Sequence, residues 1–163
     1  MRYTPFSADL FIKNRAKLYA QLPPKSIVVI SSNDIMPTNA DGTMGFRQNS
    51  DLFYLSGLDQ EETLLILYPD APEAQWREIA FVRETSELIE IWEGHKYTKE
   101  EATQISGIRN IQWTSNFDAL LKTVIYSAHH LYLTDNEHLR NASVVQTQNA
   151  RLGANWRNTY PNH

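Results

Sequence analysis

The chain has 163 residues, of which 42% are hydrophobic and 21% charged, a composition typical of one globular domain with a single core. Its formal net charge of -4 comes from 15 basic and 19 acidic residues that form no blocks, which argues against nucleic acid as a partner. The absence of cysteine excludes disulfides and thiolate chemistry. The N-terminal residues resemble no export signal, and no apolar stretch approaches the roughly 20 residues of a membrane-spanning helix, so we expect a cytoplasmic protein without a membrane partner.

The first third of the chain predicts a helix, a buried strand and a long polar connection. The helix is expected from Asp9 to Gln21 with Ser7 as its N-cap, and two prolines follow it. The run SIVVIS at residues 26–31 predicts a buried strand. Residues 33–50 are polar and punctuated by proline and glycine. Connections of this length in compact domains are usually functional or disordered, so this segment is the first candidate for a functional role.

Two short apolar runs at residues 64–68 and 79–83 are separated by a proline-containing turn, which predicts an antiparallel pair of strands. A second punctuated segment follows from Glu84 to Tyr97 and is expected to be a charged turn. Thr98 and Glu101 then have the spacing of a capping box, which predicts a short helix that ends near Gly107.

The remaining elements are a strand at residues 108–113, a helix after Ser115 as N-cap, and a strand at residues 130–134. The predicted order of strands and helices indicates an α/β fold with a mixed sheet flanked by helices. Residues 139–163 contain no Asp or Glu and show weak periodicity, so we expect a linker or an irregular tail there.

A search for catalytic chemistry finds no convincing site. The histidines have no zincin spacing, and no nucleophile elbow, dinucleotide-binding turn or phosphate loop occurs. The single cluster of histidine and carboxylate consists of His129, His130, Glu137 and His138. Adjacent histidines in a strand point to opposite faces, which favours a structural interpretation over a metal site. The pair Glu61-Glu62 resembles ordinary solvated turn charges. We therefore predict no catalytic residue and no metal ligand in this chain.

Two segments carry more information. The first is FRQNSDLFYLSGL at residues 46–58, where Ser50 or Asp51 can cap a helical turn and Gly57 permits a left-handed exit. Apolar packing does not explain why Arg47, Gln48 and Asn49 stand together at the end of the long connection. We expect these donor-rich side chains, with Ser50 and Asp51, to organise that loop by hydrogen bonds.

The second segment is Arg83-Glu84 followed by IWEGHKYT at residues 91–98. Trp92 lies between charged residues and before a glycine, where full burial is not expected. Residue chemistry alone leaves two interpretations of Trp92 open, a half-buried structural anchor and a binding residue.

These two segments, in this order and at this separation, resemble the N-terminal domain of the aminopeptidase P family, the Xaa-Pro aminopeptidases. The resemblance covers residues 7–138, and the second segment departs from the common pattern in having Lys96 where Arg is usual. It implies residues 1–138 as an N-terminal α/β domain with a ribonuclease-H-like core, and residues 139–163 as a linker or tail leading to a catalytic pita-bread domain absent from this chain.

The resemblance also implies a function. Family members remove the first residue from peptides that have proline second, with two metal ions, usually manganese, held in the catalytic domain. Their N-terminal domain mediates assembly into homodimers or homotetramers and contributes residues to the substrate channel of a neighbouring subunit. Asp41 and Trp92 match such channel residues. The chain would then be a non-catalytic domain whose partners are the catalytic domain, other subunits and the peptide substrate.

Two alternatives remain open at this stage. The chain can be a free-standing interaction module that lacks an enzyme partner, or the N-terminal domain of a prolidase-like or creatinase-like hydrolase. The paired segments favour aminopeptidase P.

Overall fold

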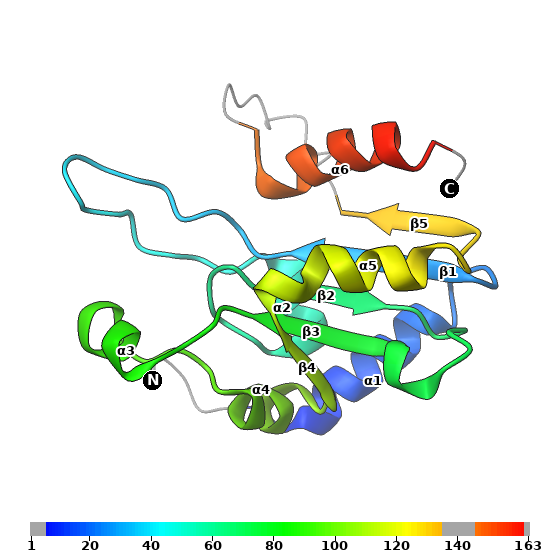
Figure 1. Ribbon diagram of the computed structural model, residues 1–163. Coiled ribbons are helices and arrows are strands. Elements are labelled where there is room, and N and C mark those ends of the chain that lie inside the picture. The colour runs from blue at the N-terminus through cyan, green and yellow to red at the C-terminus, as the bar shows by residue number, and fades with distance from the viewer. Residues whose placement is uncertain (1–5, 135–145, 162–163) are drawn as a thin grey trace.

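The computed structural model describes residues 6–134 and 146–161. The expected boundary at residues 138 and 139, together with Glu137 and His138, lies outside them. Five strands form one sheet in the order β4-β3-β2-β1-β5, in which β2 runs antiparallel to both of its neighbours and the two outer pairs are parallel (Figure 1). The mixed sheet predicted from the sequence is confirmed. The strands are β1 (Ser26–Ser31), β2 (Leu64–Leu67), β3 (Glu78–Val82), β4 (Asn110–Trp113) and β5 (His130–Leu133).

Helices cover both faces of this sheet (Figure 1). Alternate residues of the strands point to opposite faces, so two apolar clusters form, one against α1, α2 and α4 and the other against α5 and α6. The sheet is therefore the middle layer of an α/β domain. The helices are α1 (Ala8–Tyr19), α2 (Ser50–Ser56), α3 (Glu87–Glu93), α4 (Lys99–Ser106), α5 (Phe117–Ile125) and α6 (Gln148–Thr159), with short 3-10 turns at Ala74–Trp76 and Thr114–Asn116.

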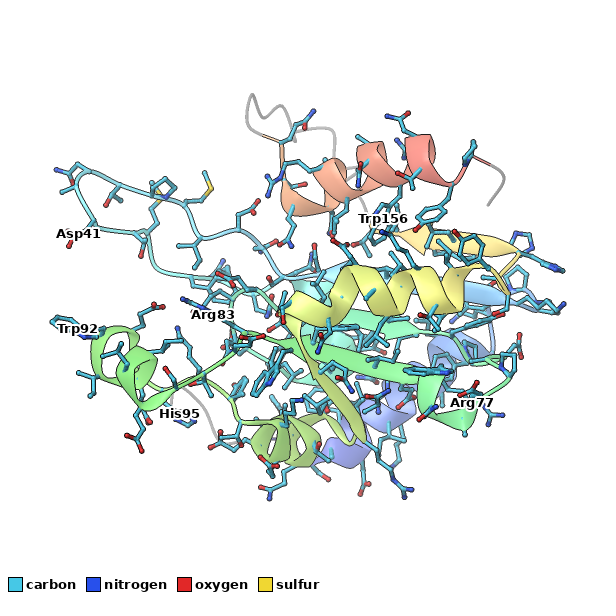
Figure 2. The ribbon with its side chains drawn as sticks, in the orientation of Figure 1. Asp41, Arg77, Arg83, Trp92, His95 and Trp156 are labelled. Atoms are coloured by element: carbon cyan, nitrogen blue, oxygen red, sulfur yellow. The ribbon has the colours of Figure 1, made fainter. Side chains whose placement is uncertain are left out.

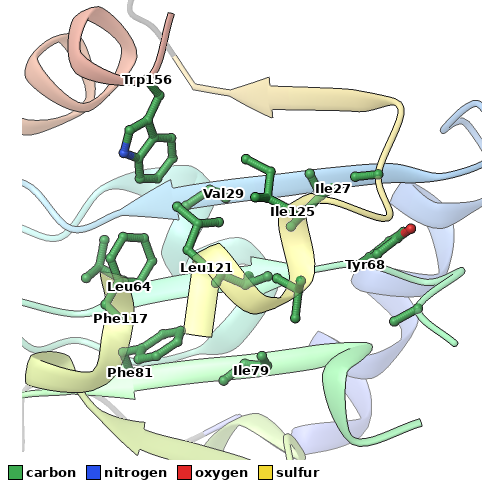
Figure 3. Packing of buried hydrophobic residues seen from close by; sticks show 14 residues of the cluster. Ile27, Val29, Leu64, Tyr68, Ile79, Phe81, Phe117, Leu121, Ile125 and Trp156 are labelled. Atoms are coloured by element: carbon green, nitrogen blue, oxygen red, sulfur yellow. The ribbon is translucent and has the colours of Figure 1, made fainter. Parts of the chain in front are cut away.

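The cluster under α5 and α6 is built around aromatic rings (Figure 3). Phe117 meets Phe81 edge to face at 5.1 Å between ring centroids and stacks on Trp156 at 5.8 Å. Only 3% of Trp156 is exposed, so α6 is anchored in the core. The expectation of an irregular tail is wrong for residues 148–159. Weak periodicity misled it, because one buried tryptophan fixes this otherwise polar helix.

Several predicted caps are present. Ser7 accepts a hydrogen bond from the backbone of Asp9, and Thr98 forms the full capping box with Glu101. Gly57 ends α2 with a left-handed φ of 72°, where a Cβ would lie 2.2 Å from the Phe11 ring.

Two other caps differ from the prediction. Asn49, and not Ser50 or Asp51, caps α2, because its side-chain oxygen reaches two backbone amides of the first turn. Ser115 caps no helix, because its hydroxyl binds Glu84 and a 3-10 turn precedes α5.

The sheet topology brings two long connections to one edge. Because only β2 runs in the opposite direction, the carboxyl ends of β1 and β3 lie at the same edge of the sheet. Residues 33–49, called the arm below, follow β1, and α3 follows β3. Figure 1 shows both extending beyond this edge on the same side of the molecule.

Candidate functional site

The arm is a hairpin-like projection. Pro37 and Thr43 form a β-bridge, and the amide of Met44 donates to the carbonyl of Met36 at 2.8 Å. Asp41 lies in the turn at the tip and is exposed (Figure 2). The long polar connection expected from the sequence therefore presents a carboxylate away from the body of the domain.

The residues at the base of the arm hold it by hydrogen bonds. The buried Gln48 side chain donates to the carbonyls of Leu58 at 3.1 Å and Gln60 at 2.9 Å, and it accepts from the amide of Asn49. Arg47 enters through its backbone carbonyl, which accepts from the side chain of Asn33 at 3.0 Å, while its own side chain is exposed. Gln48 thus ties the C-terminal end of the arm to the segment between α2 and β2, and the Asn33 contact joins the two ends of the arm to each other.

α3 presents an apolar surface to solvent. Ser86 caps this helix through the amide of Ile89, so the segment expected to be a charged turn is helical. Trp92 is 79% exposed and Ile91 is 75% exposed, and Leu88 is exposed beside them. Such exposure is incompatible with the half-buried anchor left open by the sequence.

Ion pairs fasten α3 to the sheet edge. Both terminal nitrogens of Arg83 bind the carboxylate of Glu93, and Arg83 also lies 3.8 Å from Glu61 and from Glu62. The hydrogen bonds to Glu93 raise the pKa of Arg83 against a smaller opposing effect of burial, and the nearby acidic charges add to the rise. Lys96, where the family usually has arginine, forms an ion pair with Glu61.

Glu61 is the acidic centre of this network. Its side chain is only 13% exposed, so the expectation of solvated turn charges is wrong for this residue. Burial on its own would raise the pKa of Glu61, but the Lys96 hydrogen bond, a backbone hydrogen bond and the charges of Lys96 and Arg83 together lower it. Periodicity gave no signal for this role, which depends on cations far away in the sequence.

His95 provides a second attachment of α3, this time to α4. Its Nδ1 lies 3.2 Å from Glu90, and its Nε2 lies 3.0 Å from Glu101. The Glu90 hydrogen bond is the largest influence and raises the pKa of His95; burial opposes it, and the charge and hydrogen bond of Glu101 add smaller increases. A protonated imidazole can donate to both carboxylates at once.

The two sequence segments meet on one short stretch of chain. The carbonyl of Gln60 accepts from Gln48 of the first segment, and the Gln60 side chain accepts from the amide of Tyr97 in the second at 2.6 Å. Residues 58–62 therefore contact both the base of the arm and the chain that follows α3, and they fix the position of one relative to the other. Sequence reasoning missed Gln60, because an isolated glutamine gives no signal of its two distant partners.

Asp41 and Trp92 project from different elements beyond the same edge of the sheet (Figure 2). The described residues hold no group of three or more His, Asp or Glu side chains that could bind a metal ion. A carboxylate and an indole offer attraction for a cation and an apolar face, which suits binding of a peptide.

The decisive comparison is with family profiles. The profile described as "Aminopeptidase P, N-terminal domain" matches residues 11–132, which is more than half of the chain. The chain belongs to this family. The matched range includes all five strands except the last residue of β5, together with α2, α3, α4 and α5 of this aminopeptidase P domain.

Individual relatives agree with this assignment. The Xaa-Pro aminopeptidase of Haemophilus influenzae is 27% identical over 135 residues, which cover 83% of this chain and 31% of the relative. The intermediate cleaving peptidase 55 of Saccharomyces cerevisiae is 31% identical over 115 residues, which cover 69% of this chain and 20% of the relative. The chain spans less than a third of the length of either relative.

Among solved structures, the Pseudomonas aeruginosa aminopeptidase PepP superposes with a TM-score of 0.78 at 23% identity, covering 96% of this chain and 33% of that one. At this identity the likeness shows the shared fold. Among residues 6–134 and 146–161, none of the helices has the length and apolar composition that crossing a bilayer requires.

Proposed function

We propose that this chain is the non-catalytic N-terminal domain of a cytoplasmic Xaa-Pro aminopeptidase, and that it shapes the substrate channel of a neighbouring subunit with Asp41 and Trp92. The observation that carries the proposal is the exposed Trp92 on a helix clamped to the same sheet edge that bears the arm. A large side chain held so firmly in solvent has no role in packing its own domain. The name of the Haemophilus influenzae relative supplies the substrate class.

In this proposal the channel role follows from charge and shape. The carboxylate of Asp41 attracts the free amino terminus of an incoming peptide across a subunit boundary. Trp92, with Ile91 beside it, supplies an apolar wall against the peptide side chains. The exposed apolar residues of α3 also suit an interface, which supports a homodimer or homotetramer as the working state.

The reaction itself would take place elsewhere in the protein. Two manganese ions are expected in a C-terminal catalytic domain beyond His163, as the resemblance to aminopeptidase P implies. We therefore expect the 163-residue chain by itself neither to bind manganese tightly nor to cleave peptides. Titration of the chain with manganese, followed by calorimetry, checks the first expectation directly.

The complete protein provides the main test. Asp41→Asn and Trp92→Ala should each raise the KM for an Xaa-Pro tripeptide several-fold while kcat changes little, because the change removes binding and leaves the reacting groups intact. Arg109→Gln, an exposed change at the opposite edge of the sheet, is the control. Unchanged kinetics in both variants would reject the channel role. Parallel assays on Xaa-Pro dipeptides and creatine distinguish prolidase-like and creatinase-like activity.

A further inference from the structure

The arm is held from a second side by α6. Asp34, the second residue of the arm, accepts a hydrogen bond from the backbone amide of Gln148 at 3.0 Å. Its other carboxylate oxygen lies 2.7 Å from a guanidinium nitrogen of Arg151, whose second nitrogen is 3.4 Å from Asp34. These contacts join residues separated by more than a hundred positions, and they place a negative charge at the N-terminus of a 12-residue helix, where the helix dipole favours it.

α6 is itself firmly placed. Its far end is anchored by the buried Trp156. Its first turn is fixed by Asn149, whose side chain accepts from the hydroxyl of Ser31 and donates to the hydroxyl of Thr134 at 2.7 Å. Ser31 ends β1 and Thr134 follows β5. The helix is thus fixed to the ends of two strands, and it gives the arm a rigid reference.

An open pocket lies between the arm and this helix. Its volume is about 310 Å³, and it is lined on the arm side by Met36, Met44 and Phe46 and on the other by the first turn of α6. Among the described residues, the hydrogen bonds that join the arm to α6 end on Asp34. A single carboxylate therefore carries the directional part of this contact.

We propose that Asp34 is a positioning residue through which α6 sets the arm and the Asp41 carboxylate at its tip. This inference rests on the proposed function of the arm. In the proposed function, the catalytic domain follows α6 in the chain. α6, which leads towards the catalytic domain, would then also fix the arm, which reaches the substrate. The arm and the catalytic domain would therefore keep a constant relative position.

The test compares Asp34→Asn with Asp34→Glu in the complete protein. Asparagine keeps the size but loses the charge that binds Arg151, whereas glutamate keeps the charge. Asp9→Asn is the matched control, because it removes an exposed carboxylate from the first turn of another helix, α1. Amide exchange of arm peptides that contain Thr38 and Met44 is measured first, because their amides are bonded within the arm.

We expect Asp34→Asn to speed exchange in the arm by roughly three- to tenfold, the effect of losing one partly exposed ion pair at a helix end, with exchange in β1 unchanged. Asp34→Glu should restore most of the protection, and Asp9→Asn should have no effect. Arm exchange that is unchanged in Asp34→Asn overturns the inference, whatever the kinetics.

Kinetics of the same variants separate the two proposals. If Asp34 acts through Asp41, Asp34→Asn should raise KM several-fold and leave kcat unchanged, and adding Asp41→Asn should raise KM little further. Faster arm exchange with an unchanged KM would keep the positioning role of Asp34 and reject the channel role of the arm. Fully additive effects on KM would reject the action of Asp34 through Asp41.

Discussion

Both terminal nitrogens of Arg83 bind the two carboxylate oxygens of Glu93, at 2.5 and 2.9 Å, across ten residues of chain. This paired contact joins the end of β3 to the end of α3. Its geometry requires the planar guanidinium fork, which lysine lacks. Together with the His95 link to α4, this contact with Arg83 sets the orientation of the exposed face of α3.

Arg83→Lys should loosen α3 with a small loss of overall stability. The positive charge remains, but the two parallel hydrogen bonds are lost, so we expect the free energy of unfolding to fall by about 0.5–1 kcal/mol. Urea denaturation measures that loss, and amide exchange should rise in residues 87–93. Arg109→Lys is the control. A loss of several kcal/mol would show that Arg83 supports the core and not only α3.

Replacement by alanine should strongly destabilise the fold at Trp156 and leave its stability almost unchanged at Trp92. Trp156 is 3% exposed and stacks on Phe117, so Trp156→Ala should reduce the free energy of unfolding by roughly 3–5 kcal/mol. Trp92 is 79% exposed, so Trp92→Ala should change it by less than about 0.5 kcal/mol. Denaturant titration followed by circular dichroism compares the two. Unfolding caused by Trp92→Ala would show that Trp92 has a structural role.

Gln48 should be the most sensitive residue at the base of the arm. Gln48→Ala leaves the buried carbonyls of Leu58 and Gln60 without this donor, which we expect to cost about 1–3 kcal/mol of stability. Gln48→Glu should be at least as harmful, because a carboxylate cannot donate to a carbonyl. Ser50→Ala, at an exposed neighbouring position, serves as the control in the same melts. Equal melting temperatures for all the variants would contradict this account.

The link made by His95 should depend on pH. Its pKa in the folded chain is raised above the ordinary value of about 6.5, so its contribution to stability is fully present below that value and is lost as pH rises through the raised pKa. His95→Gln should therefore lower the melting temperature at about pH 6 and match the native chain at about pH 9. Glu90→Gln should weaken the same dependence. A gap between His95→Gln and the native chain that widens with rising pH would contradict the assignment.

Local patterns in the sequence were sufficient for most elements. The buried run SIVVIS, the capping box of Thr98 and the left-handed Gly57 each act through neighbours a few residues away, and the structure confirms all three. Their outcome could be predicted because a short apolar run, a capping box and a left-handed glycine are local properties of the sequence.

Other features depend on partners far along the chain. Asp34 accepts a hydrogen bond from the first backbone amide of a helix that starts more than a hundred residues later, and Trp156 fills a core built by other elements. Glu61 pairs with Lys96 across 35 positions, although its sequence context is that of a solvated charge. No local periodicity encodes such contacts.

The sequence by itself determined the α/β class, the positions of the strands and the two segments that identify the family. Only the tertiary structure decided that the arm and α3 leave the same edge of the sheet, and that Trp92 is exposed while Trp156 is buried. The physical reason is that burial and ion pairing depend on which surfaces the fold brings together. The two tryptophans are alike as residues, and their surroundings are set by the whole chain.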